Sequence, residues 1–129
     1  MPLSFKIRDG LIEITFRGDI MAKDIVQAVV LVRDAEAELE VSPDRISDLS
    51  DTNLGRLEAE DVREFAHQRN GVPTKNKVKS AIIAPKPEQF GLARLFQAHN
   101  ENPLVEVRVF RDAATAYEWL GRGQKTGQK

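Results

Sequence analysis

The sequence predicts an α/β domain in which helices pack on a mixed, mostly parallel sheet, in the element order ββαβαβαβα. Two short segments of alternating apolar and polar residues flank Asp9-Gly10, a dipeptide that favours a two-residue hairpin turn. After this hairpin, short apolar segments alternate with segments whose apolar residues recur at helical spacing, as in parallel strands connected by helices. The 129 residues show no internal repeat, so we expect one domain over residues 1–121 and a flexible basic tail over residues 122–129.

The first three elements follow from the periodicity of apolar residues. Residues 4–8 and 11–17 alternate apolar and polar side chains and form the predicted hairpin. In residues 20–40, apolar side chains such as Val32 recur at helical spacing, which predicts an amphipathic helix. Acidic residues of this segment, including Glu36, are expected on its other faces.

The next two elements are a polar strand and a short helix. Residues 44–50 are predicted as a strand, although only Ile46 and Leu49 are apolar, which is few for a buried central strand. Residues 58–69 are predicted as a helix, with acidic residues in the first turn, where the helix dipole favours them. Gly71 then ends this helix.

A second strand is expected at the centre of the sheet. Residues 79–85 contain the run Ala81-Ile82-Ile83-Ala84, which is too short for a helix and is bounded by Pro85. Such a run is typical of a strand that is buried on both faces.

The C-terminal elements are a helix, a strand and a last helix. Pro87 suits a helix start, and the helix is expected over residues 88–99. Residues 105–109 alternate valine with charged residues, which predicts a strand. Asp112 is the expected N-cap of a final helix over residues 113–120.

The charge distribution argues against nucleic acid as a partner. Nineteen basic and twenty acidic residues give a net charge of −1, which provides no field to hold a polyanion. Residues 34–64 nevertheless hold eleven acidic and three basic side chains, whereas residues 65–129 hold eleven basic and five acidic ones. Such a separation of acidic from basic residues is typical of a domain that orients a charged partner, and also of ordinary solvated helix faces.

The composition favours a cytoplasmic protein. Cysteine is absent, so neither disulfides nor thiolate chemistry is expected. The sequence has no apolar segment of the roughly 20 residues that span a bilayer. The start of the chain also lacks the pattern of a secretory signal. We therefore expect no membrane span.

Motifs for catalysis and cofactor binding are missing from the sequence. The glycines do not form a phosphate-binding fingerprint. His67 and His99 lie on separate predicted helices without metal-ligand spacing. Ser50, His67 and Asp48 could be drawn as a triad, but no nucleophile elbow accompanies the serine. We expect a protein that is not an enzyme and has no cofactor or metal.

The segment over residues 48–53 is the first candidate site. It contains Asp48, Ser50, Asp51 and Thr52 and follows a predicted parallel strand, where ligands bind in open α/β sheets. These residue types also make turns and helix caps through local hydrogen bonds. Phosphorylation of Ser50 or Thr52 would place nearly two negative charges beside the two aspartates and act as a switch.

A second candidate surface lies on the predicted helix over residues 88–99. Its apolar residues cover an arc of about 220°, wider than the roughly 100° that one core-facing stripe requires. Phe90, Leu92 and Leu95 are therefore candidates for a dimer interface or a ligand pocket, with Arg94 available for an anionic group. The alternative is that a neighbouring helix or loop buries the extra apolar surface.

Three stretches together resemble a known family. They are DLSDTN at residues 48–53, SAIIAPKPEQFGLARLFQ at residues 80–97 and VRVFRDAATAYEWL at residues 107–120. The chain resembles the SpoIIAA-like or STAS-like proteins, small bacterial domains related in fold to anti-sigma-factor antagonists and to CRAL-TRIO lipid-binding domains. The resemblance covers nearly the whole chain in element order, and it implies a β-α superhelix.

The resemblance implies two hypotheses of different classes. The first is a non-enzymatic regulatory module that binds a protein partner, switched by phosphorylation after the third strand, where this chain has Ser50 and Thr52. The second is a carrier of a lipid-like or other apolar anion, held between the sheet and the helix that contains Phe90 and Arg94. A pocket of a few hundred Å³ beside Phe90 would favour the carrier, whereas a solid core with an exposed segment over residues 48–53 would favour the regulatory module. A homodimer is expected in either case.

Overall fold

The computed structural model describes residues 2–122, so most of the predicted basic tail lies outside the described residues. The strands are β1 (Leu3–Arg8), β2 (Leu11–Asp19), β3 (Asp44–Asn53), β4 (Val78–Ile83) and β5 (Val105–Phe110). The helices are α1 (Ala22–Ala37), α2 (Ala59–Asn70), α3 (Pro87–Ala98) and α4 (Ala113–Trp119). The predicted order ββαβαβαβα is confirmed.

The five strands form one mixed sheet in the order β1-β2-β3-β4-β5. β1 and β2 are antiparallel, and each later neighbour pairs in parallel. The predicted hairpin is confirmed: Asp9 and Gly10 both have positive φ (53° and 74°), as a type I′ turn requires.

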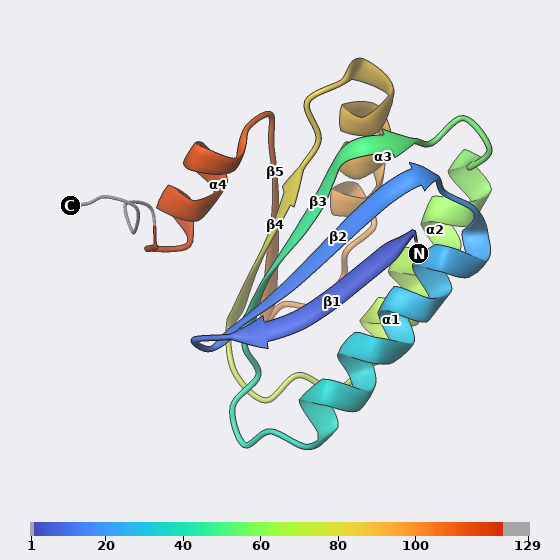
Figure 1. Ribbon diagram of the computed structural model, residues 1–129. Helices are drawn as coiled ribbons and strands as arrows, with labels where there is room; N and C mark the ends of the chain where they lie inside the picture. The colour runs from blue at the N-terminus through green and yellow to red at the C-terminus, as the bar shows by residue number, and fades with distance from the viewer. Residues whose placement is uncertain (1, 123–129) are drawn as a thin grey trace.

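Helices cover both faces of the sheet. α1, α2 and α3 lie on one face, and α4 lies on the other (Figure 1). The larger core cluster, which includes Ile14, Phe16 and Ile82, is packed under the three helices. A smaller cluster, which includes Ile46 and Ile83, packs with Ala116 of α4.

Two strand predictions need correction. The polar strand β3, and not β4, is the middle strand of the sheet, although β4 is buried as predicted. β3 also continues to Asn53, three residues beyond the predicted end. It does so because its end pairs with the end of β2 across a register shift, in which Leu49 and Ser50 together face Phe16. The segment over residues 48–53 is therefore the end of a strand.

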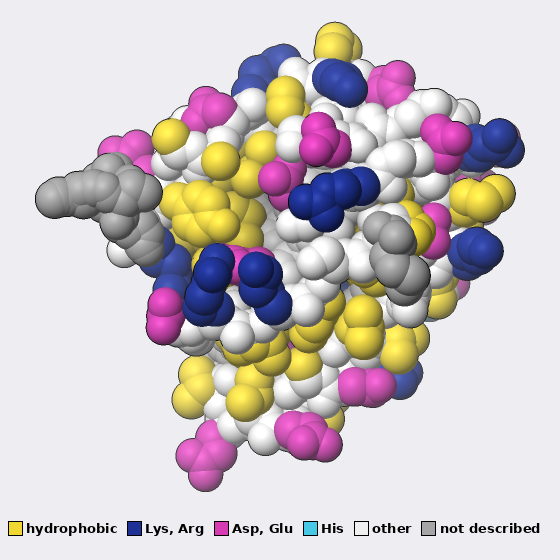
Figure 2. Space-filling model, in the orientation of Figure 1, with side chains coloured by type: hydrophobic (Ala, Val, Ile, Leu, Met, Phe, Trp, Pro, Cys, Tyr) yellow, Lys and Arg dark blue, Asp and Glu magenta, His cyan; other side chains and the backbone are white. Residues whose placement is uncertain are grey.

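The uneven distribution of charge along the chain does not produce a patch of one sign on the face shown in Figure 2. Acidic and basic side chains are interspersed there, with apolar side chains between them. Within residues 2–122, no helix is long and apolar enough to cross a membrane.

Candidate ligand-binding site

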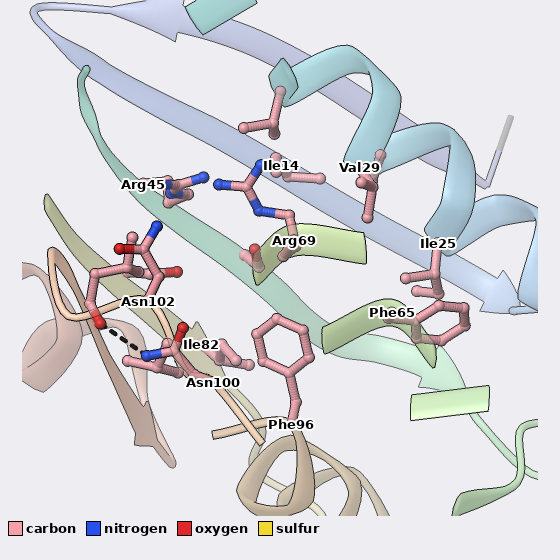
Figure 3. Close-up of a pocket in the computed structure, with 16 residues that line it drawn as sticks. Ile14, Ile25, Val29, Arg45, Phe65, Arg69, Ile82, Phe96, Asn100 and Asn102 are labelled. Carbon is pink, nitrogen blue, oxygen red and sulfur yellow. Dashed lines mark hydrogen bonds between the residues drawn. The ribbon is translucent and has the colours of Figure 1, made fainter. Parts of the chain in front are cut away.

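A cavity of about 110 Å³ lies between the sheet and the helices α1, α2 and α3 (Figure 3). Its apolar wall combines strand residues such as Ile14 with helix residues such as Val29 and Phe96. Its polar lining consists of Arg45, Ser47, Arg69, Ser80, Asn100 and Asn102. The cavity is thus mostly apolar, with a few convergent polar groups, as is typical of sites for small molecules.

A second cavity of about 120 Å³ lies beside the first one. Five residues line both cavities: Ile25, Ser47, Phe65, Ile82 and Phe96. The second cavity extends toward the start of α2, where Leu54, Leu57 and Val62 line it. Apart from Ser47, all of its described lining residues are apolar. The two spaces together offer a polar end and an apolar end.

Arg45 and Arg69 define the polar end. Figure 3 shows the two guanidinium groups pointing toward one another, one from β3 and one from the last turn of α2. The carboxylate of Glu36 on α1 lies 3.2 Å from Arg45 Nη2 and 3.7 Å from Arg69 Nη2. The side chains of Glu36, Arg45 and Arg69 are only 3%, 5% and 13% exposed. Two positive charges and one negative charge are therefore buried together.

Burial lowers the pKa of both arginines by more than the Glu36 carboxylate raises it. Burial is the main cause that lowers the pKa of Arg45 to about 10, and the neighbouring Arg69 lowers it further. Glu36 and Asp44 oppose this shift. Burial likewise lowers the pKa of Arg69. Both side chains remain cationic at neutral pH, so the cluster keeps a net positive charge.

The local sequence explains how three separate elements supply this cluster. Arg45 is the second residue of β3 and pairs across the sheet with Ser80 of β4. Ala28, Val32 and Glu36 lie at four-residue spacing on the buried side of α1, so the expectation that Glu36 faces away from the apolar stripe is wrong. Glu36 takes the place of an apolar residue because Arg45 and Arg69 approach it there.

The other polar residues of the cavity are held by the surrounding loops. Asn100 Nδ2 donates to the carbonyl of Val105 (2.8 Å), and Asn102 Nδ2 donates to Thr74 Oγ1 (2.8 Å). Asn102 Oδ1 in turn accepts from the amide of Leu104 (2.9 Å). These bonds fix the loop between α3 and β5 as one rim of the cavity.

The structure places the candidate switch residues at the end of β3. Ser50 Oγ donates to Asp48 Oδ1 (2.6 Å), and the Ser50 side chain is half-buried. Thr52 is buried, and its hydroxyl donates to the Leu49 carbonyl (2.6 Å). Asp51 is exposed. These residues are neighbours in the strand but do not line either of the two interior cavities.

Of the four residues predicted for a ligand or dimer surface, Leu92 alone lines a cavity. Phe90 is half-buried and packs against the larger core cluster. The guanidinium groups of Arg111 and Arg94 lie 4.1 and 5.7 Å from the centre of its ring. Leu95 is half-buried as well. Ala93 belongs to the larger core cluster, and Phe90, Leu92 and Phe96 pack against it, so most of the wide apolar arc of α3 faces the interior.

Sequence reasoning missed Glu36, Arg45 and Arg69. A signal for Glu36 was present, since a carboxylate four residues after Val32 continues the apolar stripe of α1. The low apolar content of β3 was a second signal. Within residues 2–122, no group of three or more His, Asp or Glu side chains is placed to hold a metal ion.

The sheet topology and the helix layers define a SpoIIAA-like fold. Among solved structures, the chain is similar to an uncharacterised protein of the DUF3478 family with a SpoIIAA-like fold from Shewanella loihica PV-4, with a TM-score of 0.56 and 19% identity. The similarity covers 92% of this chain and 91% of that chain. No protein-family model matches the chain, and no curated protein sequence matches it. The chain therefore has the SpoIIAA-like fold that its sequence resemblance implies.

Proposed function

We propose that the protein is a non-enzymatic binding domain that holds a small ligand with an apolar body between the sheet and the helices α1, α2 and α3. The observation that carries this proposal is the pair of adjoining cavities of about 110 and 120 Å³ in the interior. Both spaces are partly open to solvent, so a ligand with an apolar body can bury its surface against their apolar walls.

The chemistry of the lining favours binding over catalysis. The described residues that line the first cavity offer hydroxyl, amide and guanidinium groups, and none is a His, Asp, Glu, Lys, Tyr or Cys. Hydroxyls, amides and guanidinium groups orient a ligand but do not serve as general bases at neutral pH. The size of each cavity suits a few carbon atoms, since a cavity of about 150 Å³ holds a benzene molecule. A short aliphatic or aromatic body fits this space.

Titration with octan-1-ol tests the proposed cavity site without involving a charged head group. Ala28 is buried and lines the first cavity, so Ala28→Leu fills part of the space. We expect saturable binding to the wild type, followed by amide chemical shifts, and about tenfold weaker binding to Ala28→Leu. Ala114→Leu, on the exposed side of α4, is the matched control and should bind as the wild type does. Absence of saturable binding, or equal binding by Ala28→Leu, would contradict the proposal.

A second proposed function is a protein-interaction module that is switched at Ser50. The half-exposed hydroxyl of Ser50 beside Asp48 favours Ser50 over the buried Thr52 as the modified residue. A phosphoryl group there would repel Asp48 and change any surface docked at the end of β3.

A protein partner, a cytoplasmic location and a homodimer stay predictions. For the homodimer, the test is the solution mass, and a monomer mass at all concentrations would contradict it.

The Ser50 proposal is tested on protein purified from its own host. Mass spectrometry should find a phosphoryl increment that maps to Ser50. Ser50→Ala should lower the free energy of unfolding by at most about 1 to 2 kcal/mol, because it removes one local hydrogen bond, while partner capture changes. An unmodified Ser50 in all growth conditions would count against this function.

A further inference from the structure

The buried charge cluster between α1, β3 and α2 is unbalanced. Glu36 is shared between the two guanidinium groups, at 3.2 Å from Arg45 and 3.7 Å from Arg69. At these positions, Arg45 Nε, Nη1 and Nη2, Arg69 Nη1 and both carboxylate oxygens of Glu36 are buried without a hydrogen-bond partner, so Glu36 neutralises one charge without satisfying the guanidinium donors. Buried guanidinium nitrogens without partners are costly, since a guanidinium can donate five hydrogen bonds. The cluster therefore has both an unneutralised charge and unused donors.

The unused donors belong to residues that line the cavity. Arg45 and Arg69 are among its lining residues, whereas Glu36 is not. The cavity therefore borders the two guanidinium groups, while the Glu36 carboxylate is not part of its lining. Lys75 adds to the positive charge nearby, because its Nζ donates to the Glu36 carbonyl (3.1 Å). Asp44 Oδ1 accepts from the Lys79 amide (2.8 Å) and not from a guanidinium.

We infer that the ligand of the interior cavity carries one anionic head group of the carboxylate type, which the guanidinium groups of Arg45 and Arg69 bind. This inference rests on the proposed function and specifies its ligand class. The ligand is then an amphipathic monocarboxylate whose apolar body lies along Phe65 and Phe96, two of the five residues that line both cavities.

Charge and geometry favour a monoanion over a dianion. One carboxylate would neutralise the single positive charge left by Arg45, Arg69 and Glu36, whereas a phosphate dianion would leave a buried negative charge. A carboxylate also accepts two parallel hydrogen bonds from one guanidinium. Ser80, which pairs with Arg45 across the sheet, and Ser47 line the same cavity and add hydroxyl donors.

The depressed pKa of Arg45 agrees with this assignment. The pKa is lowered to about 10 because burial outweighs the attraction of Glu36 and Asp44. A second carboxylate within hydrogen-bond distance would favour the charged form of the guanidinium and raise its pKa again. An arginine whose charge and donors are already paired within the protein would gain little from a further anion.

The test compares octanoate with octan-1-ol by calorimetry near neutral pH. The two probes share the same chain and differ in the charge of the head group. We expect the wild type to bind octanoate about tenfold more tightly than octan-1-ol or better. Arg45→Met and Arg69→Met should each remove this preference while binding octan-1-ol as the wild type does. Each variant leaves one arginine to pair with Glu36, so the fold is retained.

Arg94→Met is the matched control. Arg94 is exposed, stacks on Phe90 and does not line either interior cavity, so the preference for octanoate should be unchanged. Equal binding of octanoate and octan-1-ol by the wild type would overturn the inference and leave the proposed function standing. A preference that survives in both arginine variants would also overturn it. Binding of neither probe would overturn the proposed function together with the inference.

Discussion

We expect Arg45 to lower the stability of the protein without a ligand. Its side chain is 5% exposed, and burial together with Arg69 lowers its pKa to about 10. A cation with a lowered pKa in the folded state is destabilising wherever it is protonated in both states. Here the destabilisation of about 3 kcal/mol applies in full below about pH 10 and is relieved as the pH rises toward the unfolded value.

Arg45→Met should therefore stabilise the ligand-free protein. We expect the free energy of unfolding, measured with urea, to rise by about 1 to 3 kcal/mol, because the variant keeps the Glu36–Arg69 pair and removes the excess charge. The gain should be equal at about pH 6 and about pH 8, since both lie below the folded pKa. Arg33→Met, at an exposed surface pair, should change stability by less than about 1 kcal/mol. A loss of stability in Arg45→Met would contradict the assignment of excess charge.

Glu36→Gln should have the opposite effect. The variant leaves two buried guanidinium groups without a counter-charge, so we expect a loss of about 3 to 5 kcal/mol in urea unfolding. Glu106→Gln removes an exposed carboxylate that lies 3.7 Å from Arg108 and should cost less than about 1 kcal/mol. If the two variants behaved alike, Glu36 would not be the counter-charge of the cluster.

Among the elements, the central strand β3 is the one whose polar residues the sequence pattern does not explain. Ile46 and Leu49 predict the strand correctly, but its apolar content is lower than that of a typical central strand. Arg45 and Ser47 are polar because they face the interior cavity. The polar residues of this central strand thus indicate a site. The sequence alone does not show that Arg45 and Ser47 face the cavity, because it does not show which face of the sheet each residue occupies.

The second core, between the sheet and α4, has a simpler basis. Ile83 of β4 is 4% exposed and packs in the cluster that contains Ala116 and Leu120. Ile83→Ala should lower the free energy of unfolding by about 2 to 5 kcal/mol. Ile7→Ala, on the edge strand β1 at 44% exposure, should cost about 1 kcal/mol or less. An Ile83→Ala cost below that of Ile7→Ala would be inconsistent with the position of β4.

At the scale of the whole molecule, local patterns determined the element order, whereas the site depends on contacts that no local pattern contains. The hairpin at Asp9-Gly10 and the apolar run of β4 are local signals. Glu36, Arg45 and Arg69 come from three elements, and they meet because β3 lies in the middle of the sheet with α1 and α2 over one face. Sequence periodicity gives neither the strand order nor the register that brings them together.

Ligand binding should also stabilise the whole domain. A ligand at about one hundred times its Kd adds about 2.7 kcal/mol to the free energy of unfolding. Octanoate at such a concentration should therefore raise the Tm of the wild type, by roughly 4 °C per kcal/mol for a domain of this length. Arg45→Met should show a higher Tm without octanoate and a smaller rise with it. An equal rise in the wild type and the variant would show that octanoate binds away from Arg45.

A crystal structure of the protein with octanoate is the decisive test of the proposed ligand site. We expect the alkyl chain in the cavities beside Phe65 and Phe96, with the carboxylate about 3 Å from guanidinium nitrogens of Arg45 or Arg69. Cavities free of octanoate at a saturating concentration, or octanoate bound only on the outer surface, would contradict it.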